Sequence, residues 1–86
     1  MPYIKPSARD KVDKQIEALF KSSDGSMGQL NYIITKLLLL GEPASYDDFN
    51  SLVGVLECAK MEFYRRKVAL YEASKKEENG DVYGNH

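Results

Sequence analysis

Residues 45–76 read SYDDFNSLVGVLECAKMEFYRRKVALYEASKK, and this stretch decides the fold of the chain. It contains no proline and consists mostly of residues that favour helix. Ser45, with Asp48 three residues later, resembles a capping box, and acidic residues in a first turn suit the positive end of the helix dipole. The stretch therefore predicts one long helix, about 48 Å in length at 1.5 Å per residue.

Two shorter amphipathic helices are expected before this stretch. Ser7 can cap the first, over about residues 8–21, and Ser26 or Asp24 can cap the second, over about 27–40. In both, apolar residues recur at the spacing of one helix face. These positions are Val12, Ile16, Leu19 and Phe20 in the first helix, and Met27, Leu30, Ile33, Ile34, Leu37 and Leu38 in the second.

The segments between and beyond the helices complete an all-α prediction. Gly41 is expected to end the second helix, and the prolines among residues 2–6 predict an extended arm. The polar residues 77–86 predict a mobile, flexible tail. Because 86 residues are too few for two cores, we expect a single domain over 1–76, a helical hairpin packed on the long third helix.

Composition excludes several classes of function. The 12 basic residues are balanced by 13 acidic ones, whereas proteins that bind nucleic acid usually carry a basic excess. The lone Cys58 and the terminal His86 cannot build a zinc site within one chain. We therefore expect no metal, no cofactor and no nucleic-acid partner.

The hydropathy pattern predicts a cytoplasmic protein. The most apolar stretch, residues 33–40, is interrupted by Lys36 and is too short to span a bilayer. The N-terminus lacks the apolar core of a secretory signal. We expect no membrane association.

The long helix carries apolar residues on more than one side, and such a helix must bury more than one side. Since two short helices can cover only part of it, the surplus predicts self-association as a dimer or larger oligomer. The alternative is that the short helices straddle the long one and a few apolar residues stay exposed. The stripe expected to receive the short helices is Phe49, Leu52, Leu56, Ala59, Phe63, Arg66, Leu70 and Ala73; the self-association candidates are Gly54, Cys58, Met61 and Val68.

No pattern of catalytic residues is present, and we expect a protein that is not an enzyme. Cys58 has no internal histidine to activate it, and its apolar neighbours predict a buried, inert thiol. The most suggestive local feature is a cluster of tyrosine and basic residues on the long helix, which could hold an anionic ligand or a protein partner. Ion pairs within the helix, to Glu62 or Glu72, explain the same cluster without a ligand. Its members are Lys60, Tyr64, Arg65, Arg66 and Tyr71.

Five segments form a pattern that covers nearly the whole chain: MPYIK (1–5), LNYIIT (30–35), GVLECAK (54–60), EFYRR (62–66) and ENGDVY (78–83). With them the chain resembles a family of small uncharacterised proteins found in bacteriophages and in bacterial genomes, often as prophage genes. The resemblance implies an intracellular setting and brings no assigned activity. Because the tail belongs to the pattern, Asp81 and Tyr83 become candidate contact residues.

Together these observations predict a phage- or prophage-type accessory protein that acts by protein–protein interaction as a homo-oligomer. Its partners would be further copies of itself and a host or phage protein. The alternative is an oligomer that binds or sequesters a small anionic ligand such as a nucleotide, with Lys60, Tyr64, Arg65 and Arg66 from neighbouring subunits building the site.

Overall fold

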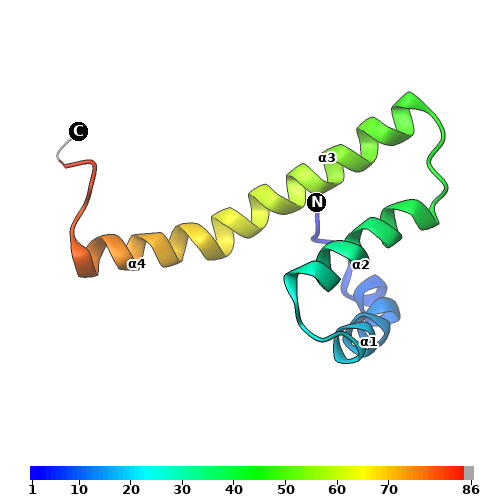
Figure 1. The fold of residues 1–86 in the computed structure, drawn as a ribbon, viewed down its shortest axis with the longest axis horizontal. Coiled ribbons are helices and arrows are strands. Elements are labelled where there is room, and N and C mark those ends of the chain that lie inside the picture. The colour runs from blue at the N-terminus through cyan, green and yellow to red at the C-terminus, as the bar shows by residue number, and fades with distance from the viewer. Residues whose placement is uncertain (85–86) are drawn as a thin grey trace. The chain divides into compact units, whose positions relative to one another are not determined.

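The computed structural model describes residues 1–84, and every regular element in that part of the chain is helical (Figure 1). The last helix runs without a break through three of these elements and is 34 residues long. The predictions of an all-α chain and of a long last helix are therefore confirmed. The elements are α1 (Pro6–Ser22), α2 (Met27–Leu40), α3 (Tyr46–Phe63), the π-helical segment η1 (Tyr64–Val68) and α4 (Ala69–Asn79).

By its internal contacts the chain divides into two compact units, Met1–Leu52 and Val53–His86. The first unit holds α1, α2 and the start of α3, and the second holds the remainder of the long helix and the turn that follows it. A single domain over 1–76 remains a prediction. The helix continues past the predicted end to Asn79, and the last two residues of the predicted mobile tail lie outside the described part.

The first helix begins earlier than the sequence pattern predicts. Lys5 stands at the N-cap with an extended backbone, and Pro6 occupies the first helical turn. The predicted Ser7 cap is wrong, because proline has no amide to leave unsatisfied and its fixed φ suits the first helical position. The preceding arm is held by Arg9, whose Nε donates a hydrogen bond to the carbonyl of Ile4 at 2.8 Å.

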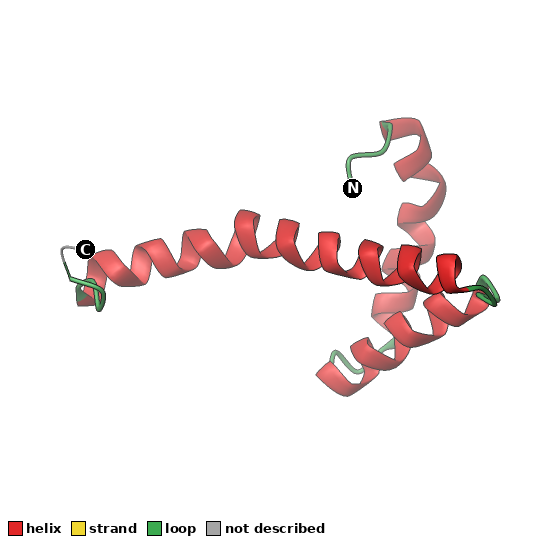
Figure 2. Cartoon of the chain, turned by 90° about the horizontal axis from the view of Figure 1, so that it is seen from above, coloured by secondary structure: helices red, strands yellow, loops and turns green. Residues whose placement is uncertain are grey.

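Short loops join α1 to α2 and α2 to α3 (Figure 2). Of the two predicted caps of α2, Ser26 performs the role, since its Oγ accepts a hydrogen bond from the Gln29 amide at 3.1 Å. Asp24 shapes the preceding turn by accepting a hydrogen bond from the Ser26 amide at 2.8 Å. Hydrogen bonds from Ser26 hold the pKa of the Asp24 carboxyl below its usual value.

The prediction that Gly41 ends α2 is confirmed, since the helix ends at Leu40 and Gly41 is its C-cap. Gly41 follows the last helical residue but has an ordinary φ of −78°. The left-handed position belongs to Glu42, with φ of 52°, whose amide donates to the carbonyl of Leu39 at 2.9 Å. Glutamate therefore occupies the conformation that glycine usually takes at a helix end.

The predicted capping box at the start of α3 is confirmed. The Asp48 amide donates to the Ser45 Oγ at 3.0 Å, and the Ser45 amide donates to the Asp48 Oδ2 at 3.2 Å. The same carboxylate oxygen accepts from the Ala44 amide at 3.1 Å. The bonds from Ala44 and Ser45 lower the pKa of the Asp48 carboxyl.

No side chain among the described residues is buried, although many are large and apolar. On α1, Ile16 and Phe20 belong to the predicted apolar face, and Phe20 is 71% exposed. Within the first unit no other helix packs along the length of α1, so this face stays open there. The apolar faces of α1 and α2 are present as predicted, and the first unit leaves them open.

Candidate functional site

The long helix changes its hydrogen-bond pattern at the residues that the sequence marks as a candidate site. In η1 the Ala69 amide donates to the carbonyl of Tyr64, five residues back, whereas an α-helix uses the carbonyl four residues back. The segment contains Tyr64, Arg65 and Arg66. Single π turns inside α-helices occur frequently at functional sites.

The π turn changes which residues share a face of the helix. One extra residue in a turn displaces all later side chains by about 100° around the axis. Val68 therefore leaves the line of Cys58 and Met61, and Leu70 leaves the line of Phe63. The stripes predicted from a constant helical period are continuous only as far as the π turn.

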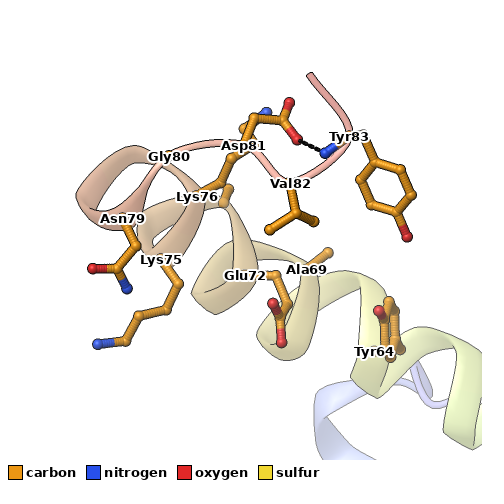
Figure 3. A pocket seen from close by; sticks show the side chains of 11 residues that line it. Tyr64, Ala69, Glu72, Lys75, Lys76, Asn79, Gly80, Asp81, Val82 and Tyr83 are labelled. Atoms are coloured by element: carbon orange, nitrogen blue, oxygen red, sulfur yellow. Dashed lines mark hydrogen bonds between the residues drawn. The ribbon is translucent and has the colours of Figure 1, made fainter. Parts of the chain in front are cut away.

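The same displacement brings Tyr64 into line with residues of α4 that the sequence pattern placed elsewhere. Tyr64 shares a face with Ala69, Glu72 and Lys76, and the chain after α4 turns back over that face (Figure 3). The result is an open groove of about 510 Å³, hereafter the tail groove. Its lining residues are Tyr64, Ala69, Glu72, Ala73, Lys75, Lys76, Asn79, Gly80, Asp81, Val82 and Tyr83.

Two residues produce the reversal that closes one side of the tail groove. Gly80 has a φ of 91°, a conformation that residues with a side chain rarely adopt. Asp81 then accepts a hydrogen bond on Oδ1 from the Tyr83 amide at 2.9 Å (Figure 3). The Asp81 carboxylate is thus used inside the turn, while the side chains of Val82 and Tyr83 remain exposed beside the groove.

Ion pairs one helical turn apart hold most of the candidate cations. Arg65 Nη2 lies 2.7 Å from Glu62 Oε1, and Lys60 Nζ lies 2.9 Å from Glu57 Oε1. Neither Lys60, Arg65, Arg66 nor Tyr71 lines the tail groove. Of the five predicted ligand residues, therefore, only Tyr64 lines the tail groove within one chain.

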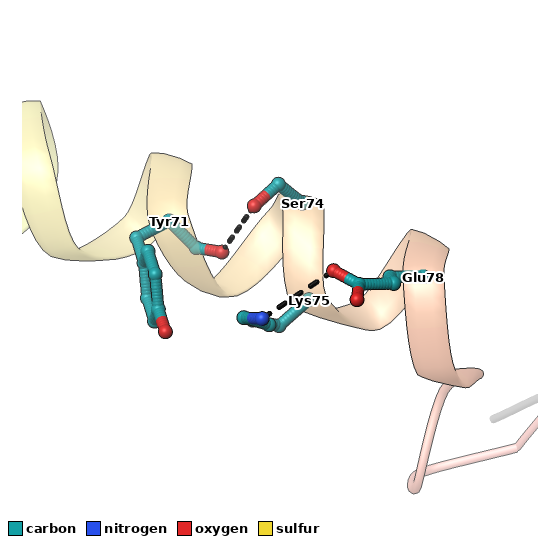
Figure 4. A network of polar contacts seen from close by, with 4 residues as sticks. All are labelled: Tyr71, Ser74, Lys75 and Glu78. Carbon is teal, nitrogen blue, oxygen red and sulfur yellow. Dashed lines mark hydrogen bonds and ion pairs between the residues drawn. The ribbon is translucent and has the colours of Figure 1, made fainter.

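Tyr71 belongs to a separate polar network on α4. Lys75 Nζ lies 5.7 Å from the centre of the Tyr71 ring, and it also lies 3.4 Å from Glu78 Oε2 (Figure 4). The carbonyl of Tyr71 accepts a hydrogen bond from the Ser74 hydroxyl at 2.8 Å. These are local contacts along one helix, and exposed pairs of this kind contribute little to stability.

The predicted self-association residues before the π turn all face solvent. Cys58 is exposed, so the prediction of a buried thiol is wrong: nothing in its own unit covers this face of the helix. Met61 is exposed as well. At Gly54 an added Cβ would meet no atom within 4 Å, so the chain itself does not require a glycine there.

A second, more apolar groove lies in the first unit, beside the loop that joins α1 to α2. It measures about 200 Å³, and it is lined by side chains of both helices. Its walls are Ile16, Leu19, Phe20, Ser23, Gly25, Ser26, Met27, Leu30 and Ile33. We refer to it as the hairpin groove.

Comparison with known protein families gives a match over nearly the whole chain. The model of one protein family, described as "Domain of unknown function (DUF6899)", matches residues 1–82. The chain belongs to this family. No curated protein and no solved structure matches the chain. The resemblance to an uncharacterised family is therefore confirmed, whereas the phage or prophage setting stays a prediction.

The family description names no activity, so the surfaces themselves carry the functional argument. No three His, Cys, Asp or Glu side chains within residues 1–84 gather as a metal ion would require. In the same part of the chain, no helix is both long and apolar enough to cross a membrane.

Sequence reasoning missed Glu72, Lys76 and Val82 as groove residues. The signal for the chain reversal was present in the Asn79-Gly80 pair, which is typical of turns. The alignment of Tyr64 with α4 had no comparable signal, because a helical wheel assumes a constant rotation per residue.

Proposed function

We propose that this protein is not an enzyme and that it acts by protein–protein interaction as a homo-oligomer. The observation that supports this proposal is the exposure of large apolar side chains on every α-helix, with none buried among residues 1–84. Burial of apolar surface is the main favourable term in folding and in association. A helical chain that leaves these faces open gains stability by covering them with another molecule.

The lengths of the helices support the same proposal. α2 has 14 residues and α1 has 17. Isolated helices shorter than about 12–15 residues are marginal in water, and in proteins most helical stability comes from packing of an apolar face. α1 and α2 therefore need a packing partner, and small domains commonly find one by oligomerisation.

The charge of the chain does not oppose association between identical copies. With 12 basic and 13 acidic residues, two copies repel each other little. Closed two-fold dimers are the commonest oligomers of soluble proteins. A homodimer is accordingly the simplest assembly that meets the need for burial.

For the biological role, we propose an intracellular accessory protein of a phage or prophage, whose oligomer binds a host or phage protein in the cytoplasm. The support is the resemblance of the five sequence segments to proteins of that setting. The exposed Tyr64 and Tyr71 side chains suit such contacts, because tyrosine is enriched at protein interfaces.

A second candidate is the binding or sequestering of a small anionic ligand by the oligomer. The tail groove favours it, since about 510 Å³ is within the range of small-molecule sites and Lys76 lies in the lining. The ion pair between Arg65 and Glu62 speaks against it, because the guanidinium would have to exchange partners to reach a phosphate. A nucleotide that raises the unfolding temperature of the wild type, but not of Lys76→Ala, would favour this candidate.

Native mass spectrometry combined with sedimentation equilibrium tests the main proposal. We expect a dimer or larger oligomer, and an unfolding temperature that rises with protein concentration because association stabilises only the folded state. A monomer at all concentrations would contradict the proposal. An oligomer that carries a fixed additional mass would place ligand binding ahead of protein binding.

A further inference from the structure

We infer that one face of α2 is the surface on which a second copy of this chain docks. This face, hereafter the α2 seam, consists of Met27, Leu30, Ile34 and Leu37. The inference rests on the proposed self-association and adds the location of the interface, between the α1–α2 hairpins of two copies.

The spacing of the seam residues is that of a coiled coil. They follow one another at intervals of three, four and three residues, which is the a/d repeat of a heptad. At 100° per residue they fall within an arc of about 80°. All four are exposed, and Met27 at the N-terminal end is 73% exposed. α2 thus presents a narrow, uncovered seam of the kind that another helix fills.

The hairpin groove adjoins the seam and shares Met27 and Leu30 with it. Ile16 and Phe20 of α1 form its other wall. A large aliphatic side chain from a second copy, such as Leu37, could enter this groove as a knob enters a hole. A ridge and a groove on the same face make the surface self-complementary, as a two-fold interface requires.

The apolar area of the seam and the groove wall approaches what a stable dimer needs. A fully buried large apolar side chain contributes about 1.5–3 kcal/mol, which corresponds to about 60–120 Å² of apolar surface. The seam and the groove wall together therefore offer about 200–400 Å² per copy at their observed exposures. A standard interface covers about 800 Å² per partner, of which about 500 Å² is apolar.

The charges of α2 favour an identical partner over a charged one. The helix carries one charged residue, Lys36, which lies about 140° from the centre of the seam at 100° per residue. On α2 itself, two copies meeting at the seam would bring no like charges together, whereas like charges across an interface are costly. A partner recognised by charge would find almost nothing on this helix to pair with.

Leu37 and Leu39 provide a matched test. Each is 58% exposed, but their side chains point about 160° apart, so only Leu37 belongs to the seam. Lysine is a good helix former, so Leu37→Lys and Leu39→Lys change the two faces with little effect on the helix itself. In sedimentation velocity we expect Leu37→Lys to raise the dissociation constant at least a hundredfold and Leu39→Lys to change it less than threefold.

The outcomes separate the inference from the proposal on which it rests. A monomeric wild type would overturn both. An oligomeric wild type that Leu37→Lys leaves intact would overturn the seam and leave the proposed self-association standing. If Leu37→Lys and Leu39→Lys weaken the oligomer equally, the α2 seam is not the interface. If circular dichroism shows that a lysine variant has lost its helices, the milder Leu37→Ala and Leu39→Ala pair decides, and a tenfold weakening by Leu37→Ala alone is expected.

Discussion

The amide of Ala69 donates its hydrogen bond to the carbonyl of Tyr64, and this single π turn sets the register of everything that follows on the long helix. Because of it, Tyr64 lies on the face over which the chain turns back at Gly80. The π turn also ends the apolar stripes that begin in α3. This one backbone hydrogen bond therefore determines both the lining of the tail groove and the length of the apolar stripes on α3.

Deleting Lys67 should convert the π turn into regular α-helix. The altered helix regains a regular hydrogen-bond pattern, and one additional backbone bond contributes about 1 kcal/mol. We expect the unfolding temperature to rise and Tyr64 to leave the tail groove. Differential scanning calorimetry measures the first effect.

Deleting Ser74 is the matched control for this experiment. It shortens the regular helix α4 by one residue without removing a π turn. We expect no gain in stability from it. If the variant lacking Lys67 is no more stable than the variant lacking Ser74, the π turn does not destabilise the folded chain.

The reciprocal bonds between Ser45 and Asp48 make the start of α3 sensitive to pH. Hydrogen bonds from Ala44 and Ser45 lower the pKa of the Asp48 carboxyl in the folded chain. A lowered folded-state pKa means that this contribution to stability is present above the unfolded pKa, near 3.9. It is lost as the pH falls through the folded-state value, because the unfolded chain then binds the proton more readily.

Unfolding temperatures measured between pH 7 and pH 2 should therefore decline less below pH 4 in Asp48→Asn than in the wild type. Asp47→Asn removes a charge from the same first turn and leaves the capping box intact. It should reproduce the wild-type decline. Ser45→Ala should lower stability by about 1 kcal/mol at neutral pH, as loss of an N-cap hydroxyl does. Identical acid profiles for the two aspartate variants would contradict this account.

Glu42 holds a strained backbone at the end of α2, and neighbouring Gly41 does not. The left-handed conformation costs a residue with a side chain about 1–2 kcal/mol, so Glu42→Gly should stabilise the chain by up to about 1 kcal/mol after the added entropy of the unfolded glycine. Gly41 has negative φ, and an added Cβ would meet nothing within 4 Å. Gly41→Ala should therefore be tolerated in a thermal unfolding measurement. Marked destabilisation by Gly41→Ala would contradict the assignment of the strain to Glu42.

Much of the helical framework could be predicted because it depends on local chemistry. The start of α2 and the capping box of Ser45 and Asp48 follow from side chains that bond backbone amides a few residues away. The start of α1 was misplaced because Ser7 and Pro6 both suit the N-terminus of a helix, and proline was the stronger signal.

The candidate site could be predicted only in part. The apolar positions on α1 and α2 were found from their period, but period alone does not show whether a face is covered within the same chain. The grouping of Tyr64 with Glu72 depends on a π turn, for which the residues Tyr64–Val68 give no recognised sequence signal.

A substitution at Gly54 distinguishes between two candidate interfaces for self-association. One is the α2 seam, and the other is the face of the long helix that contains Gly54, Cys58 and Met61. A glycine within a helix costs about 0.5–1 kcal/mol relative to alanine, and at Gly54 an added Cβ meets nothing of the same chain. If the α2 seam is the interface, Gly54→Ala should stabilise the protein by this amount and leave its oligomeric mass unchanged. Gly28→Ala, on the side of α2 away from the seam and equally open, should give a smaller gain because Gly28 lies in the first turn of its helix. Loss of the oligomer in Gly54→Ala alone, measured by native mass spectrometry, would show instead that a second helix approaches closely along Gly54, Cys58 and Met61.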